Sequence, residues 1–133
     1  SWALNQKVSQ ELGDIDVLAV SADGLRVWVI EAKNLRLCRT EVEVASRLYE
    51  YRGRTVINSK GKEVPDALLR HIRRVQYLRE RNSALCHRLE LLCPPEVRGL
   101  LIVDSPQPMN FYLLDKMDDA ASAFLDAIDN FKF

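Results

Sequence analysis

Two runs of β-branched residues with a turn signal between them dominate the pattern of hydrophobic and polar positions early in the chain. Residues 13–20 and 26–33 are typical of strands, and Asp23-Gly24 is typical of a two-residue type I′ turn, which needs positive φ at both central positions. The pattern therefore predicts an antiparallel hairpin in which Ala22 faces Leu25.

This register gathers charged side chains on one face of the hairpin. It places Asp16 opposite Glu31 and Asp14 opposite Lys33, with opposed Cβ atoms about 5 Å apart, and residues two apart on a strand share a face. The other face then receives Ile15, Val17, Ala19, Trp28, Ile30 and Ala32.

The opposed carboxylates of Asp16 and Glu31 would repel each other in a bare sheet. A hard divalent cation would remove that conflict, since Mg²⁺ is commonly held by one or two carboxylates together with water and phosphate oxygens. The alternative is a solvated polar face without a ligand.

Further elements follow from spacing and capping signals. Thr40 followed by Glu43 is a capping box that starts a helix, for which Gly53 is a natural stop. The other predictions are a short helix over residues 4–12, a third strand over 35–38, a long helix from Pro65 to 92, a buried strand over 97–103 and an amphipathic helix over 115–133.

Asp16, followed fifteen residues later by Glu31-Ala32-Lys33, resembles the motif of the PD-(D/E)XK nuclease superfamily, in particular its resolvase-like and nuclease-related branches. One departure is Ile15, which stands where that motif often has proline. The resemblance implies an α/β domain with a restriction-endonuclease-like core, a central mixed sheet flanked by helices in the order α-β-β-β-α-(α)-β-α. We expect a single domain over residues 1–133 that is part of a larger protein with an upstream domain.

The resemblance also implies the chemistry of the site. Asp16, Glu31 and Lys33 would be catalytic in metal-dependent hydrolysis of nucleic acid that leaves a 5′-phosphate. DNA is the expected substrate. Asp16, Glu31 and the backbone carbonyl of Ala32 would hold Mg²⁺ or Mn²⁺, with Glu11 and Asp14 as further candidate ligands. Lys33 would orient the attacking water and stabilise the developing negative charge.

Positive charge is concentrated in the middle of the chain. The whole sequence has 19 basic and 19 acidic residues, but residues 34–88 have thirteen Lys or Arg against six Asp or Glu. Phosphate contacts dominate nucleic-acid affinity, although a basic stripe on a helix can also be an ordinary solvated surface. Seven residues are expected to contact nucleic acid. They are Arg36 and Arg39 after the hairpin, Lys60 and Lys62 in a loop over 53–64, and Arg70, Arg74 and Arg81 on the long helix.

Two other classes stay open: a nuclease fold that has lost catalysis and binds nucleic acid or protein, and a small α/β domain in which the motif is a coincidence. The three cysteines lack zinc-ligand spacing and are expected to be reduced core thiols. His71 and His87 have no matching nucleophile. With no signal peptide or membrane span visible, we expect a cytoplasmic or nucleoid-associated protein without a membrane partner. A homodimer is an option, since cutting two strands needs two sites.

Overall fold

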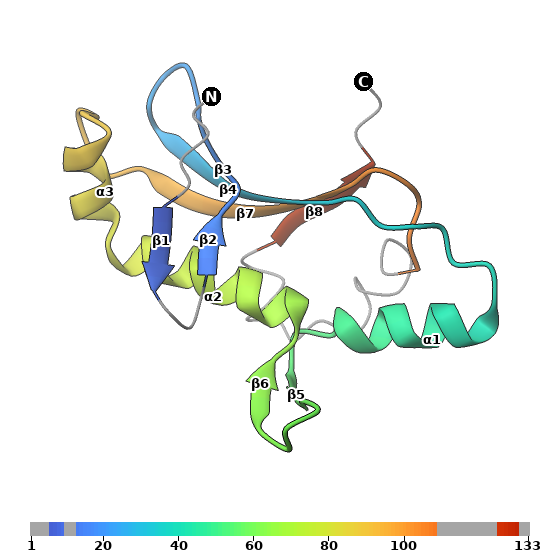
Figure 1. Ribbon diagram of the computed structural model, residues 1–133. Helices are drawn as coiled ribbons and strands as arrows, with labels where there is room; N and C mark the ends of the chain where they lie inside the picture. Colours follow the sequence, from blue (N-terminus) through green and yellow to red (C-terminus); the bar gives the residue numbers. More distant parts are fainter. Residues whose placement is uncertain (1–5, 10–12, 109–124, 131–133) are drawn as a thin grey trace.

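A four-stranded mixed sheet forms the centre of the protein (Figure 1). The computed structural model describes residues 6–9, 13–108 and 125–130. The sheet has the order β3-β4-β7-β8, in which β3 and β4 pair antiparallel while β7 is parallel to both β4 and β8. The strands are β3 (Val17–Val20), β4 (Arg26–Lys33), β7 (Glu96–Val103) and β8 (Leu125–Asn130). With three helices in the described ranges, this confirms the α/β class.

The β3–β4 hairpin has the register that the sequence predicts, with Val17 opposite Ile30 and Val20 opposite Val27. The predicted two-residue turn is wrong, because the chain reverses through a four-residue loop over 22–25. Gly24 takes the positive φ that this loop needs, +72°. The register is unchanged because the longer loop is centred on the same point of the chain.

The first strand of the hairpin breaks at a bend on Asp16. The preceding strand β2 (Gly13–Ile15) pairs antiparallel with β1 (Gln6–Ser9), so Asp14 lies opposite Lys7 and not opposite Lys33 as predicted. The predicted helix over residues 4–12 is also wrong where it is described, because β1 takes the unpaired edge of β2. The rest of that helix, including Glu11, lies outside the described residues.

The bend also changes which side chains face the core. Ile15 was expected on the face of Val17, but it is buried in the same cluster as Leu18 and Val29 on the other face. A break in the strand lets consecutive residues abandon strict alternation. The bend thereby adds an apolar side chain to the core and leaves Asp16 exposed at the edge.

Helix α1 (Glu41–Glu50) begins at the predicted capping box. The Thr40 Oγ1 atom accepts the N–H of Glu43, and the Glu43 Oε2 atom accepts the N–H of Thr40, both at 3.2 Å. These two hydrogen bonds satisfy backbone donors that the first turn would otherwise leave unpaired. No residue of α1 is buried, so its own capping and its flanking segments must position it.

Residues 35–38, predicted as a third strand, form no strand. Side chains of the segment after β7 instead take up their backbone groups. The N–H of Leu35 donates to Asp104 Oδ1 at 3.0 Å, and Ser105 Oγ donates to the Leu35 carbonyl at 2.9 Å. The Nε2 atom of buried Gln107 donates to the carbonyls of Leu35 and Arg36. Side-chain groups thus replace the neighbouring strand that the prediction assumed.

The predicted long helix is two helices, α2 (Ala67–Glu80) and α3 (Asn82–Arg88). It begins after Asp66 rather than at Pro65, because the Asp66 carboxylate caps α2 by accepting the N–H of Leu69 at 2.8 Å. The same carboxylate accepts two N–H groups of the preceding segment, from Arg52 and Arg54. Buried Asp66 therefore ties the start of α2 to the chain that leads into it.

Helix α2 packs against one face of the sheet and forms two core clusters with it. Full burial of one such Val, Leu or Ile side chain stabilises the fold by about 1.5–3 kcal/mol. The first cluster contains Ile15, Leu18, Val27, Val29, Val75, Leu85 and Val97; the second contains Tyr51, Leu68, Ile72, Leu101 and Val103. The strand predicted over 97–103 is confirmed as a central strand of the sheet.

Within the described ranges, no helix lies on the opposite face of the sheet (Figure 1). That face carries half-buried Trp28, Ile30, Leu100 and Ile102. The helix predicted over 115–133 is wrong for Leu125–Asn130, which forms β8, and its other residues lie outside the described ranges. The edge of β7 offers backbone hydrogen bonds to a parallel strand, and this pairing favours a strand at residues 125–130 over an isolated amphipathic helix.

The loop predicted over 53–64 contains a small hairpin, β5 (Thr55–Ile57) and β6 (Glu63–Pro65). Asn58 closes its turn, because its Oδ1 atom accepts the N–H groups of Lys60 and Lys62, both at 2.9 Å. Figure 1 shows this hairpin projecting away from the sheet. The side-chain amide of Asn58 therefore turns a sequence that looks like a loop into an ordered ribbon.

The three cysteines are unpaired, and Cys93 is exposed while Cys38 and Cys86 are half-buried. The prediction of core thiols is therefore wrong, because none of them is fully buried. None of the described helices has the length and apolar character needed to cross a membrane.

Candidate active site

Asp16 is held at the bend between β2 and β3 by a hydrogen bond to the neighbouring strand. The N–H of Ala32 donates to Asp16 Oδ2 at 3.1 Å. In the hairpin register Ala32 would face Ile15, but the bend has removed that residue from the ladder. The Asp16 carboxylate therefore accepts the Ala32 N–H in place of the backbone carbonyl that a continuous strand would supply. It is thereby fixed beside Glu31 and Lys33 on β4.

Glu31 is a buried carboxylate between two cations. Its Oε1 atom lies 2.7 Å from Lys33 Nζ, and its Oε2 atom lies 2.5 Å from Arg74 Nη1. The Glu31 residue is 6% exposed, whereas the Lys33 side chain is 37% exposed. A buried carboxylate needs such partners, since an unpaired charge in the interior is strongly unfavourable. The end of β4 therefore presents a buried carboxylate paired with a half-exposed lysine, and Asp16 binds the backbone of the residue between them.

Arg74 belongs to this site and not to a surface track for phosphates. It was predicted on the outer face of the helix, but it is 8% exposed and points from α2 to Glu31. Its guanidinium passes close under Gly13, where an added Cβ would lie 3.2 Å from Nη2. Gly13 also has φ +72°, so this position favours glycine for both backbone and space.

His71 lies one helical turn before Arg74 and is 1% exposed. Its pKa is lowered from 6.5 to about 4, mainly by burial, with smaller lowering contributions from the charges of Arg74 and Lys33 and an opposing one from Asp16. Neither ring nitrogen makes a well-formed hydrogen bond to the described residues, although the Leu100 carbonyl lies near enough to raise the pKa slightly. A neutral imidazole thus lies within electrostatic reach of the acid–lysine cluster.

The low pKa of His71 makes the fold sensitive to acid. Between pH 6.5 and about 4 the unfolded chain binds a proton at this residue and the folded protein does not, so the free energy of unfolding falls as the pH falls through this window. We expect a loss of about 3 kcal/mol by pH 4 from this group. The measurement is urea unfolding at a series of pH values for wild type and His71→Leu.

The His71→Leu variant should lose this part of the acid dependence, while the exposed His87→Gln variant should keep it. Identical pH profiles for wild type and His71→Leu would contradict the assignment of the acid dependence to His71. Other acidic groups contribute to both proteins equally, so the difference between the profiles is the informative quantity.

Sequence reasoning missed the contribution of α2 to the site. The signal was present, because residues 68, 71, 72 and 75 follow the i, i+3, i+4, i+7 spacing of a buried helix face. That spacing places His71 inside the apolar stripe and Arg74 at its margin. What the sequence does not show is which strand the stripe contacts, and that contact makes Arg74 the partner of Glu31.

The other predicted nucleic-acid contacts do not gather at this site. Arg36 and Arg39 lie in the segment between β4 and α1, and Lys60 and Lys62 lie exposed at the turn between β5 and β6. Arg70 is exposed on α2. Arg81 lies at the end of α2, where its guanidinium carbon is 3.6 Å from the centroid of the Tyr77 ring. The basic residues are therefore distributed over several surfaces.

The candidate oxygen donors for Mg²⁺ or Mn²⁺ at this site are Asp16 and Glu31. Asp16 and Glu31 supply two carboxylates at adjacent strand ends, which is the number that such an ion commonly takes from a protein. The described residues hold no cluster of three His, Cys, Asp or Glu placed to enclose a metal. Lys33 and Arg74 contact both oxygens of Glu31, so a metal ion at this carboxylate would have to displace one of these contacts.

The described residues place the chain in the α/β class, with Asp16 at a strand bend and with Glu31 and Lys33 near the end of the neighbouring strand β4. The model of the family described as "Anti-phage protein Upx-like" matches residues 2–128. The chain belongs to the Upx-like anti-phage family. No curated protein and no solved structure shows a significant match to it.

Proposed function

We propose that this domain is a metal-dependent nuclease that hydrolyses phosphodiester bonds of nucleic acid as part of a defence against phage. DNA is the proposed substrate. One observation carries the proposal: at one end of the β3–β4 hairpin, Asp16 accepts the N–H of Ala32, and the residues on either side of Ala32, Glu31 and Lys33, form an ion pair. The family description supports the defence role. We further assign the sheet β3-β4-β7-β8 with α2 to a restriction-endonuclease-like core that lacks the third strand of the resemblance.

Asp16 and Glu31 would hold the metal ion, with the Ala32 carbonyl as a further ligand. When bound, the ion lowers the pKa of a water molecule and offsets charge on the scissile phosphate. Lys33, half-exposed beside Glu31, would donate to the attacking water or to a phosphate oxygen. The bend at Asp16 and the ion pair with Arg74 keep both carboxylates in place before a ligand arrives.

A test of this function compares cleavage of linear, nicked and branched DNA by wild type and by Lys33→Gln, with Mg²⁺, with Mn²⁺ and with a chelator. We expect metal-dependent cleavage by wild type and a rate about 10²–10³-fold lower for the variant, as for other lost transition-state donors. The control is Arg26→Gln, which removes an exposed charge at the far end of β4. Equal rates for wild type and Lys33→Gln would contradict the role of the lysine.

The alternative function is a nuclease fold without catalysis that binds nucleic acid or protein. One observation favours it, because Arg74 and Lys33 already satisfy both oxygens of Glu31 without a metal. In that case the Glu31 pairs would serve the fold, and a folded Lys33 variant would leave phage restriction intact. Plaque counts on cells that express wild type or Lys33→Gln separate the two functions.

A further inference from the structure

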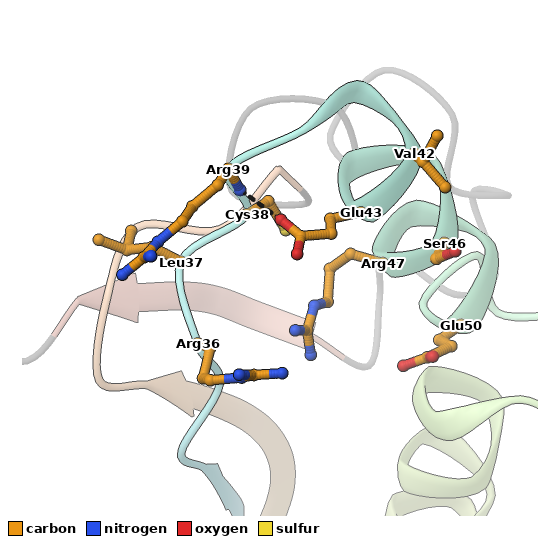
Figure 2. A pocket seen from close by; sticks show the side chains of 9 residues that line it. All are labelled: Arg36, Leu37, Cys38, Arg39, Val42, Glu43, Ser46, Arg47 and Glu50. Carbon is orange, nitrogen blue, oxygen red and sulfur yellow. Dashed lines mark hydrogen bonds between the residues drawn. The ribbon is translucent and has the colours of Figure 1, made fainter.

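A hollow between residues 36–39 and helix α1 is the second polar feature of the described surface. Figure 2 shows its side chains, of which Arg36, Arg47, Glu43 and Glu50 carry charge toward the space between the segment and the helix. Its volume is about 500 Å³. Arg39 lies at its rim. A hollow of this size accommodates a group much larger than a water molecule.

Two arginine side chains that point into this hollow form no salt bridge with a carboxylate. Within the described part of the chain, neither Arg36 nor Arg47 forms an ion pair or a side-chain hydrogen bond. Figure 2 shows both guanidinium groups directed to the same space. Three arginines, Arg36, Arg39 and Arg47, line the hollow against two glutamates, Glu43 and Glu50, and guanidinium forks match the oxygens of a phosphate.

The nearby glutamate Glu43 is committed elsewhere. Its Oε2 atom accepts the N–H groups of Arg39 at 2.6 Å and Thr40 at 3.2 Å. These two hydrogen bonds, with smaller contributions from the charges of Arg36 and Arg39, lower its pKa. Glu43 therefore fixes the loop to the helix, and its charge is directed largely to backbone donors rather than to the arginine pair.

Both walls of the hollow are anchored. Gln107 Nε2 donates to the carbonyl of Arg36 at 3.3 Å, and the capping box fixes the start of α1. Arg36 also follows Lys33 by three residues, so their Cα atoms are at most about 11 Å apart. The hollow therefore lies a few nucleotide lengths at most from the candidate active site.

From these observations we propose that the hollow between residues 36–39 and α1 binds a backbone phosphate of a nucleic-acid strand that leads into the Asp16–Glu31–Lys33 site. This inference rests on the proposed function, and it assigns Arg47, which sequence reasoning did not select, as a nucleic-acid contact beside Arg36. The phosphate is held by charge and by bidentate hydrogen bonds, so this contact is independent of base sequence.

The experiment measures binding of a fluorescent DNA oligonucleotide, single-stranded and duplex, in chelator, so that no cleavage occurs. We expect Arg47→Gln to weaken binding about tenfold. The slope of log affinity against log salt should fall by about 0.7–0.9 for the lost phosphate contact. The matched control is Arg26→Gln, at the other end of β4, which should bind as wild type does. Thermal melting checks that each variant is folded.

The outcomes separate this inference from the proposed function. Unchanged affinity and salt slope in Arg47→Gln, with DNA cleavage intact in wild type, would overturn the phosphate site alone. Stabilisation of wild type, but not of Arg47→Gln, by inorganic phosphate or a mononucleotide without any DNA binding would overturn the nucleic-acid source and indicate a free phosphorylated ligand. A selective loss of DNA binding in Arg47→Gln supports the phosphate site even if Lys33→Gln shows no catalytic role.

Discussion

Replacing Arg74 with methionine should lower the free energy of unfolding by about 3–5 kcal/mol, because the change leaves the Glu31 carboxylate buried without its nearest cation. The Arg74 side chain is 9% exposed and the Glu31 side chain 8%, so water reaches neither group well. Lys33 remains beside Glu31 Oε1, but its half-exposed ammonium cannot replace the second partner. Urea unfolding, with the transition midpoint and slope compared between the proteins, measures the effect.

The matched experiment is a double-mutant cycle. Glu31→Leu alone should also be destabilising, since it takes the Glu31 carboxylate away from the buried Arg74 guanidinium, whereas Glu31→Leu with Arg74→Met should recover much of the loss. Losses that simply add in the double variant would contradict a direct buried pair. This result matters for function, because a Glu31 variant that loses activity could have lost its fold. Asp16 and Lys33 are the cleaner probes of catalysis.

Replacing Asp16 with asparagine should abolish cleavage and leave the fold almost unchanged. Asparagine keeps an oxygen that can accept the N–H of Ala32, and Asp16 is exposed, so we expect a stability change within about 0.5 kcal/mol. The lost charge removes one of two candidate metal ligands. Loss of a supporting outer-shell group already lowers metal affinity or activity about 10–100-fold. Loss of a direct ligand should therefore lower the cleavage rate by more than about a hundredfold.

The measurement is the initial rate of DNA cleavage at saturating Mg²⁺, with a thermal melt of the same preparation. Glu96→Gln is the control, because it removes an exposed carboxylate that pairs with Arg26 at the opposite end of β4. Cleavage by folded Asp16→Asn at the rate of wild type would show that the hydrolysis occurs elsewhere.

Local signals predicted the elements that local chemistry specifies. The hairpin register follows from two β-branched strands and a turn centred at residues 23 and 24, and the larger loop did not alter it. The capping box of Thr40 and Glu43 stabilises its own helix end, so α1 begins where the sequence places it. The apolar run of β7 alternates buried and half-buried residues, as a central strand covered by α2 on one face requires.

The elements that the sequence misplaced depend on neighbours far along the chain. β1 and β8 are strands because β2 and β7 offer free edges, and residues 35–38 are not a strand because Asp104, Ser105 and Gln107 bind their backbone groups. For the candidate site, the hairpin placed Glu31 and Lys33 from local register. It could not show the bend at Asp16 or the approach of Arg74 from α2.

The most direct test of a metal site built on Asp16 and Glu31 is calorimetric titration of Mn²⁺ into wild type and Asp16→Asn in the absence of nucleic acid. We predict measurable binding by wild type and an affinity at least about tenfold lower in the folded variant. Equal Mn²⁺ affinity in the two proteins, or no binding by well-folded wild type, would contradict the metal site and favour a domain in which Arg74 and Lys33 are the permanent partners of Glu31.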